Sequence, residues 1–145
     1  MITIIKADAL YSQNLYRLEK DIFGKDCYSL QSIVQELSDA SRIYYVAMIN
    51  NEVVGYIGAN IIMDYTEIMK IAVSQNHRQK GIAKALFKEL SNELQTSGVK
   101  TINLEVKHNN IEAISLYTNL GFRQISKRAN YYGNNIHAVV LSKAL

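Results

Sequence analysis

The spacing of apolar residues along the chain follows two patterns, one typical of strands and one typical of helices. Apolar residues at every second position, as in Ile102, Leu104 and Val106, predict a strand with one buried face. Apolar residues about four positions apart, as in the series from Leu86 to Leu94, predict an amphipathic helix. The predicted strands are residues 2–6, 43–49, 52–63, 67–73, 101–106, 122–130 and 136–141. The predicted helices run from a cap at Asp8 to residue 22, from a cap at Ser29 to residue 37, over residues 80–97, and from a cap at Asn109 to residue 120.

Asparagine and glycine stand where the predicted elements must turn or end. Asn50 and Asn51 tolerate the positive φ of a tight hairpin between the second and third strands. Gly98 and Gly121 follow the last two predicted helices, where glycine commonly ends a helix. The resulting order, βααβββαβαββ, predicts an α/β fold with one central sheet. Because the chain has no proline, no linker-like segment and no internal repeat, we expect a single domain over residues 1–145.

Composition narrows the class of protein. Hydrophobic residues make up 48% of the 145 residues and charged residues 20%, which is typical of a globular domain. No apolar run approaches the roughly 20 residues of a membrane span, and the N-terminus lacks a secretory-signal pattern, so we expect no membrane partner. The single cysteine, Cys27, excludes a disulfide framework and favours a cytoplasmic location.

The charged and metal-ligating residues argue against two further classes of protein, those that bind nucleic acid and those that bind metal ions. The net charge is only +3 and the basic residues are scattered, so the sequence predicts no nucleic-acid surface. The histidines at 77, 108 and 137 are far apart and there is one cysteine, so the sequence predicts no metal site.

The segment 71–84 carries the most informative chemistry. A predicted strand ends in a polar loop that leads directly into a helix, so unpaired amide N–H groups meet the positive end of the helix dipole there. Such a helix end suits an anion, for example a pyrophosphate. Gly81 and Ala83 leave the backbone accessible, and the cations Arg78 and Lys80 destabilise a helix start unless an anion is bound there. The plain structural alternative is that Gly81 is a permissive helix start and the cations form a solvated face.

The loop matches one known pattern. Neither a Walker A loop nor a Rossmann fingerprint is present. The shorter pattern R/Q-x-x-G-x-G/A is present as Arg78-x-x-Gly81-x-Ala83, after Ile71-Ala72-Val73. With this pattern the chain resembles the GNAT superfamily of acetyl-coenzyme A-dependent N-acetyltransferases.

The resemblance covers essentially the whole chain, because further motifs follow in order. They are Leu104-Glu105-Val106-Lys107, Asn110, Ala113, Leu116-Tyr117, Leu120-Gly121-Phe122 and Lys127-Arg128-x-x-Tyr131-Tyr132. This combination is most similar to the ribosomal-protein-alanine N-acetyltransferases, which modify the N-terminal residue of a small-subunit ribosomal protein. The resemblance implies a GNAT-type fold with a mixed, mostly antiparallel central sheet flanked by helices, and acetyl-CoA as the acetyl donor. It implies coenzyme contacts from Ile71, Ala72, Val73, Arg78, Gln79, Lys80, Gly81, Ile82, Ala83, Lys84 and Asn110.

Glu105 and Tyr117 are the candidate catalytic residues. Strand alternation places Glu105 opposite Leu104 and Val106, where it can line a cleft or be an ordinary exposed glutamate. By spacing alone, Tyr117 can equally be a core residue. The resemblance implies that Glu105 accepts a proton from the amine, through water, and that Tyr117 donates one to the departing coenzyme A sulfur. Glu67 is a rival base, because related histone-type acetyltransferases carry a glutamate on the equivalent strand.

We expect the acceptor to be a primary amine, and in particular the N-terminal α-amino group of a protein, with a ribosomal protein as the implied partner. At pH 7, freeing a lysine amine of pKa about 10.4 costs roughly 3.5 kcal/mol more than freeing an α-amino group of pKa about 7.8. Tyr131, Tyr132 and Glu67 are the predicted contacts of the acceptor, although tyrosines are also common in sheets. We expect a monomer or weak dimer that requires no nucleic acid contact.

Two departures from the subfamily pattern bear on the acceptor. The segment Asp26-Cys27-Tyr28-Ser29 stands in place of a Pro-Trp-Ser segment, and Ile136-His137 stands in place of an acidic pair. The alternatives are therefore a GNAT enzyme for a small-molecule amine or a protein lysine, a coenzyme A-binding module without catalysis, and a basic module that docks on ribosomal RNA.

Overall fold

The computed structural model describes residues 1–145, and its strands and helices follow the predicted order. The strands are β1 (Thr3–Lys6), β2 (Arg42–Ile49), β3 (Glu52–Ile62), β4 (Tyr65–Val73), β5 (Thr101–Lys107), β6 (Arg123–Gly133) and β7 (Ile136–Ala144). The helices are α1 (Ser12–Phe23), α2 (Leu30–Ser38), α3 (Ile82–Thr96) and α4 (Ile111–Asn119). Three short 3-10 turns are η1 (Ala9–Tyr11), η2 (Gly24–Asp26) and η3 (Gln75–His77).

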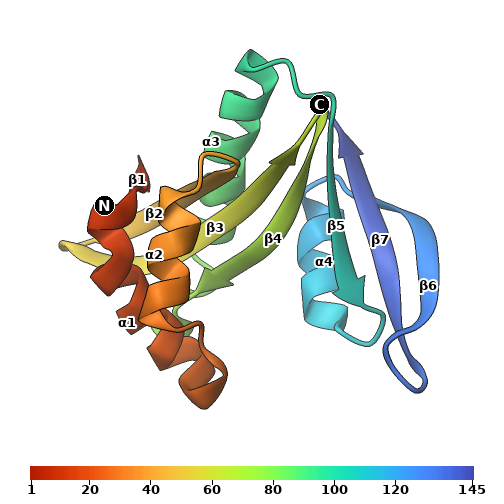
Figure 1. The fold of residues 1–145 in the computed structure, drawn as a ribbon, viewed down its shortest axis with the longest axis horizontal. Coiled ribbons are helices and arrows are strands. Elements are labelled where there is room, and N and C mark those ends of the chain that lie inside the picture. The colour runs from red at the N-terminus through yellow and green to blue at the C-terminus, as the bar shows by residue number, and fades with distance from the viewer.

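All seven strands belong to one sheet, in the order β1-β2-β3-β4-β5-β7-β6. Every neighbouring pair is antiparallel except β4 and β5, which are parallel. The predicted mixed, mostly antiparallel sheet is therefore confirmed. Helices α1 and α2 cover one face of this sheet and α3 and α4 cover the other (Figure 1). We call these the α1 face and the α3 face.

Each face has its own apolar core. The α3-face core is the larger, with 19 buried residues that include Leu86 and Leu90 of α3 and Leu104 of β5. The α1-face core has seven buried residues, among them Leu15 of α1 and Ile33 of α2. Alternating side chains of the strands supply both cores, which is why the apolar pattern of the central strands is nearly continuous.

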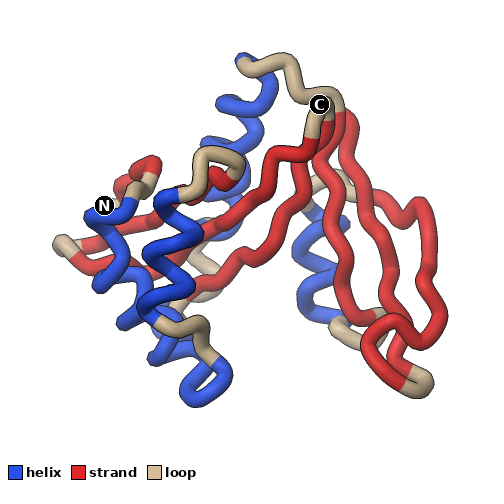
Figure 2. Tube along the Cα trace, viewed as in Figure 1, coloured by secondary structure: helices blue, strands red, loops and turns tan.

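The sheet splits between β4 and β5. Only the first residues of the two strands pair, from Tyr65–Thr101 to Glu67–Asn103. Beyond them the strands diverge, so that in Figures 1 and 2 they meet near the C-terminus and lie apart at their carboxyl ends. We call the space between residues 68–73 of β4 and 104–107 of β5 the gap. The chain enters α3 from the end of β4 and enters α4 from the end of β5, so both helices begin beside the gap.

Two predicted helix starts were wrong in detail. The N-cap of α4 is Asn110, whose Oδ1 accepts the Ala113 N–H at 3.1 Å, and not Asn109. Helix α3 begins at Ile82 and not at residue 80, because Gln79 and Gly81 have positive φ angles of 61° and 78°, which a right-handed helix excludes.

Asp8 also caps a shorter element than predicted. Its Oδ1 accepts the Leu10 N–H at 3.0 Å and so caps the turn η1. Helix α1 itself begins only at Ser12.

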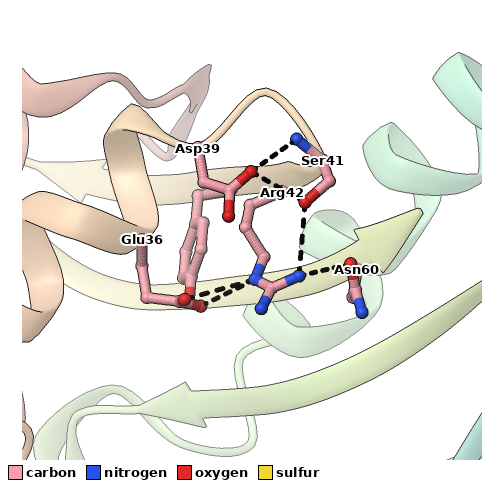
Figure 3. A network of polar contacts seen from close by, with 6 residues as sticks. Glu36, Asp39, Ser41, Arg42 and Asn60 are labelled. Atoms are coloured by element: carbon pink, nitrogen blue, oxygen red, sulfur yellow. Dashed lines mark hydrogen bonds and ion pairs between the residues drawn. The ribbon is translucent and has the colours of Figure 1, made fainter. Parts of the chain in front are cut away.

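A polar network fixes the end of α2 to the sheet. The Arg42 Nε donates to both carboxylate oxygens of Glu36 at 3.2 Å, and its Nη1 donates to Asn60 Oδ1 (Figure 3). The Tyr44 hydroxyl donates to Glu36 at 2.9 Å. Three elements, α2, β2 and β3, are therefore tied together by charge-assisted hydrogen bonds.

The carboxylate of Glu19 is wholly buried beneath α1. It accepts hydrogen bonds from the Tyr56 hydroxyl and, at 3.0 Å, from the Tyr28 N–H. The Lys70 ammonium lies 3.2 Å from it. These contacts satisfy a charge that is otherwise costly to bury, and they join α1 and the segment before α2 to strands β3 and β4.

We expect Glu19→Ala to lower the free energy of unfolding by about 3 kcal/mol, because the Lys70 ammonium and the Tyr56 hydroxyl lose their buried acceptor. Urea unfolding followed by circular dichroism measures this loss. Glu89→Ala is the matched control, since Glu89 is exposed on α3 and its removal changes stability by less than about 0.5 kcal/mol. Equal unfolding midpoints for the two variants contradict the assigned role of Glu19.

Candidate active site

The edges of the gap carry unpaired backbone groups. Beyond Glu67, β4 pairs with β3 on one side and with no strand on the other, and the end of β5 pairs only with β7. Along each edge, every second N–H and C=O group therefore lacks a strand partner. An extended ligand that carries amide groups can bind such an edge as an added strand does.

The first turn of α3 is open to a ligand. Its N-cap, Gly81, supplies no side-chain hydrogen bond, so the first N–H groups of the helix are left without an acceptor. No atom lies within 4 Å of the position that a Cβ of Gly81 would take. The helix dipole and these N–H groups make this end a suitable site for a phosphate or other anion.

The side chains of the loop before α3 serve different purposes. Arg78 Nε donates to the Val73 carbonyl at 3.1 Å, which fastens the loop to the end of β4. Lys80 Nζ lies 3.4 Å from His77 Nδ1 and is exposed at the start of the helix. Lys84 lies one turn further on and lines a cavity of about 350 Å³ between α3 and the end of β7.

The predicted coenzyme contacts on β4 offer backbone and not side chains. Ile71 and Val73 pack against the α3-face core, and Ala72 is buried in the α1-face core. Ile82 is buried as well, with 2% of the residue exposed. The residues at the end of β4 therefore present their backbone amide and carbonyl groups to the gap, and not their side chains.

Glu105 lies on β5, on the α1 face. Its neighbours Leu104 and Val106 are in the α3-face core, so alternation turns Glu105 to the other side, as predicted. Its Oε1 lies 3.1 Å from the Arg128 Nη2, and 22% of its side chain is exposed. Arg128 is on β6, so the ion pair reaches across β7, where the buried Ala138 is opposite Arg128.

Glu67 and the tyrosines of the last hairpin lie near Glu105. Partial burial raises the pKa of Tyr132, and the negative charges of Glu105 and Glu67 raise it further. The ring centroids of Tyr131 and Tyr132 are 5.1 Å apart, and both side chains are exposed. Glu67 is opposite Asn103, two positions before Glu105 on β5, and Arg128 contacts both Glu105 and the Tyr131 ring, so the structure brings four of the predicted residues together: two carboxylates and two tyrosines.

Tyr117 lies on the α3 face. Its ring packs edge-on against Phe122 with centroids 5.5 Å apart, and only 6% of the residue is exposed. Burial alone raises the pKa of its hydroxyl, so the phenol keeps its proton at neutral pH. Glu105 and Tyr117 therefore lie on opposite faces of the sheet, and the gap beside β5 is where the sheet is open between the faces.

Sequence reasoning missed the surroundings of Lys70. Its ammonium lies 3.6 Å from the centroid of the Phe23 ring and 4.3 Å from that of Tyr28. These cation–π contacts and the ion pair with Glu19 hold the segment before α2 against β4, close in sequence to Glu67. No periodic pattern predicts these contacts, since they join residues far apart along the chain.

Two further observations concern metal ions and membranes. No group of three or more His, Cys, Asp or Glu side chains is placed so that it could hold a metal ion. None of the helices combines the length and the apolar character needed to span a bilayer.

The split sheet is the fold of known N-acetyltransferases. The crystal structure of the ribosomal-protein-S18-alanine N-acetyltransferase from Escherichia coli matches it with a TM-score of 0.87 at 24% sequence identity, over 99% of this chain and 94% of that one. The chain belongs to the acetyltransferase (GNAT) family, whose sequence profile matches residues 12–122. The resemblance drawn from the motifs is thereby confirmed.

Two curated relatives are similar in sequence. The ribosomal protein bS18-alanine N-acetyltransferase of Escherichia coli (strain K12) is 35% identical over 83 residues, which are 57% of this chain and 56% of that protein. The match thus spans little more than half of that relative. The N-alpha-acetyltransferase of Saccharolobus solfataricus is 28% identical over 131 residues, covering 81% of this chain and 78% of that protein.

Proposed function

We propose that the protein transfers an acetyl group from acetyl-CoA to a primary amine, and that the amine is the N-terminal α-amino group of a protein, with a ribosomal protein as the first candidate. The observation that carries the proposal is the split between β4 and β5, with an uncapped helix at its opening and Glu105 and Tyr117 on opposite faces. The names of the two curated relatives, both of which act on protein N-termini, support the choice of acceptor.

The residues around the gap fit acetyl-CoA. The pyrophosphate suits the free N–H groups of the first turn of α3, where Lys80 adds positive charge. The amide groups of the pantetheine arm suit the unpaired edge of β4. Asn110 uses its Oδ1 to cap α4, which leaves its amide NH2 free to donate to the same arm.

In the proposed reaction the amine approaches from the α1 face and the thioester lies in the gap. Glu105 takes the proton of the amine through a water molecule as the new C–N bond forms. The C–S bond breaks, and Tyr117 gives its proton to the departing sulfur on the α3 face. A backbone N–H near Ala72 and Val73, on the unpaired edge of β4, supplies the hydrogen bond to the carbonyl oxygen.

The chemistry of the base favours an α-amino group over a lysine amine as the acceptor. A single carboxylate that works through water suits an amine of pKa about 7.8 better than one of pKa about 10.4, because roughly 3.5 kcal/mol less is needed to free it at pH 7. Tyr131 and Tyr132 would form the wall beside an extended peptide end, and Glu67 would contact the amine from the opposite side of the gap.

A thiol-release assay with acetyl-CoA tests the proposal. The acceptors are N-terminal peptides of ribosomal proteins, the same peptides with a blocked terminus, a lysine-containing peptide with a blocked terminus, polyamines and aminoglycosides. We expect thiol release only with free N-termini. Release with a small amine or with lysine overturns the choice of acceptor, and binding of coenzyme A without release from any acceptor supports a non-catalytic module.

We expect Gly81→Ala to weaken coenzyme A binding at least tenfold, since the new methyl group projects into the open space at the helix start. Isothermal titration calorimetry measures the affinity. Gly98→Ala is the matched control: its φ is 84°, its Cβ position is also open, and it follows the far end of α3. Both variants carry a similar strain of roughly 1–2 kcal/mol. Equal affinities in the two variants contradict a site at the start of α3.

A further inference from the structure

Two cations stand on the α1 face beside the tyrosine pair. The Lys107 Nζ lies 5.7 Å from the centroid of the Tyr132 ring, and the Arg128 guanidinium carbon lies 5.4 Å from that of Tyr131. Lys107 follows Glu105 on β5 by two positions and therefore lies on the same face. Arg128 contacts Glu105 directly. Both cations are thus neighbours of the proposed base and of the proposed acceptor wall.

On the α1 face of β5, β7 and β6, Glu105 is the only carboxylate, and it balances one of these cations, Arg128. From residue 113 to residue 145 the chain contains no aspartate or glutamate, and two of its cations there, Arg123 and Arg128, lie on the α1 face, because Ser142 and Ala138 opposite them alternate with Leu141 and Val139 of the α3-face core. Lys107 has no carboxylate within 4 Å, and Arg128 has only Glu105. No helix covers the α1 face of β5, β7 and β6, so this positive surface is open (Figure 1).

A peptide bound with its amine at Glu105 and its chain along β5 passes this surface. Successive Cα atoms are about 3.8 Å apart, and Lys107 is two strand positions, roughly 6.6 Å, from Glu105, so the second or third side chain of such an acceptor comes close to Lys107 and Arg128. We propose that Lys107 and Arg128 select an acceptor with an acidic side chain at its second or third position. This inference rests on the proposed function, whose acceptor it specifies more closely.

The test compares peptides that begin with alanine and differ only at positions two and three, which are Glu-Glu, Ala-Ala or Lys-Lys. We expect kcat/KM for the Glu-Glu peptide to exceed that for the Lys-Lys peptide about tenfold at low salt. The preference shrinks in 0.5 M KCl, since the charges are exposed and are screened there. Lys107→Glu should abolish or reverse the preference for the Glu-Glu peptide.

Lys127→Glu is the matched control for Lys107→Glu. Lys127 precedes Arg128 on β6 and is opposite Val139, a residue of the α3-face core, so it lies on the other face. The same charge change there leaves the peptide preference unchanged. Turnover of all three peptides at equal rates, or an equal effect of the two variants, overturns this inference alone. Absence of turnover with every peptide overturns the proposed function and this inference with it.

Discussion

Glu105→Gln is expected to lower kcat roughly 10²–10³-fold, within the roughly 10²–10⁴-fold that a general acid or base contributes. Glutamine has the same size as glutamate and still accepts a hydrogen bond from Arg128, but it cannot take the proton of the amine. The KM for acetyl-CoA should change little, because the coenzyme contacts lie in the gap and at the start of α3. Steady-state thiol release with a peptide acceptor measures both constants.

Glu67→Gln serves as the comparison, because Glu67 is the other carboxylate near Tyr132. As an acceptor contact that does not carry the proton, it is expected to raise KM for the peptide and to lower kcat less than about tenfold. Melting curves establish that both variants are folded. A larger loss of kcat at Glu67 than at Glu105 reverses the two assignments.

Local patterns predicted the elements of this fold because each element is encoded within its own segment. The alternation of Ile102, Leu104 and Val106 predicted both the strand β5 and the face on which Glu105 lies. The exact start of α3 was missed, because it depends on the positive φ angles of Gln79 and Gly81 and not on apolar spacing. A pattern of side chains carries little information about such backbone conformations.

The contacts between distant segments could not be predicted in the same way. Glu19 reads as an ordinary polar position of an amphipathic helix, yet it is wholly buried because Lys70 and Tyr56 satisfy its charge. Arg128 belongs to a motif of the sequence, but that motif does not predict its contact with Glu105 across β7. Strand order decides such pairs, and single-segment periodicity does not determine strand order.

Tyr117→Phe is expected to lower kcat about 10²-fold, because the departing thiolate loses its proton donor. The hydroxyl donates no hydrogen bond within the chain, and burial is the only cause that raises its pKa. Removing the oxygen therefore leaves the edge-on packing against Phe122 intact. The melting temperature and the affinity for coenzyme A should stay close to those of the unmodified protein.

Tyr45→Phe is the matched control for this last prediction. Tyr45 is also a buried tyrosine of the α3-face core, and burial is likewise the largest cause that raises its pKa. Its hydroxyl, however, donates to Glu93 of α3. Its loss should lower the stability by about 1 kcal/mol and leave kcat unchanged. The two variants thus separate a catalytic role from a structural one. Tyr117→Phe loses turnover at constant stability, and Tyr45→Phe loses stability at constant turnover. Unchanged kcat in Tyr117→Phe means that the proton for the sulfur comes from water or from another group at the gap.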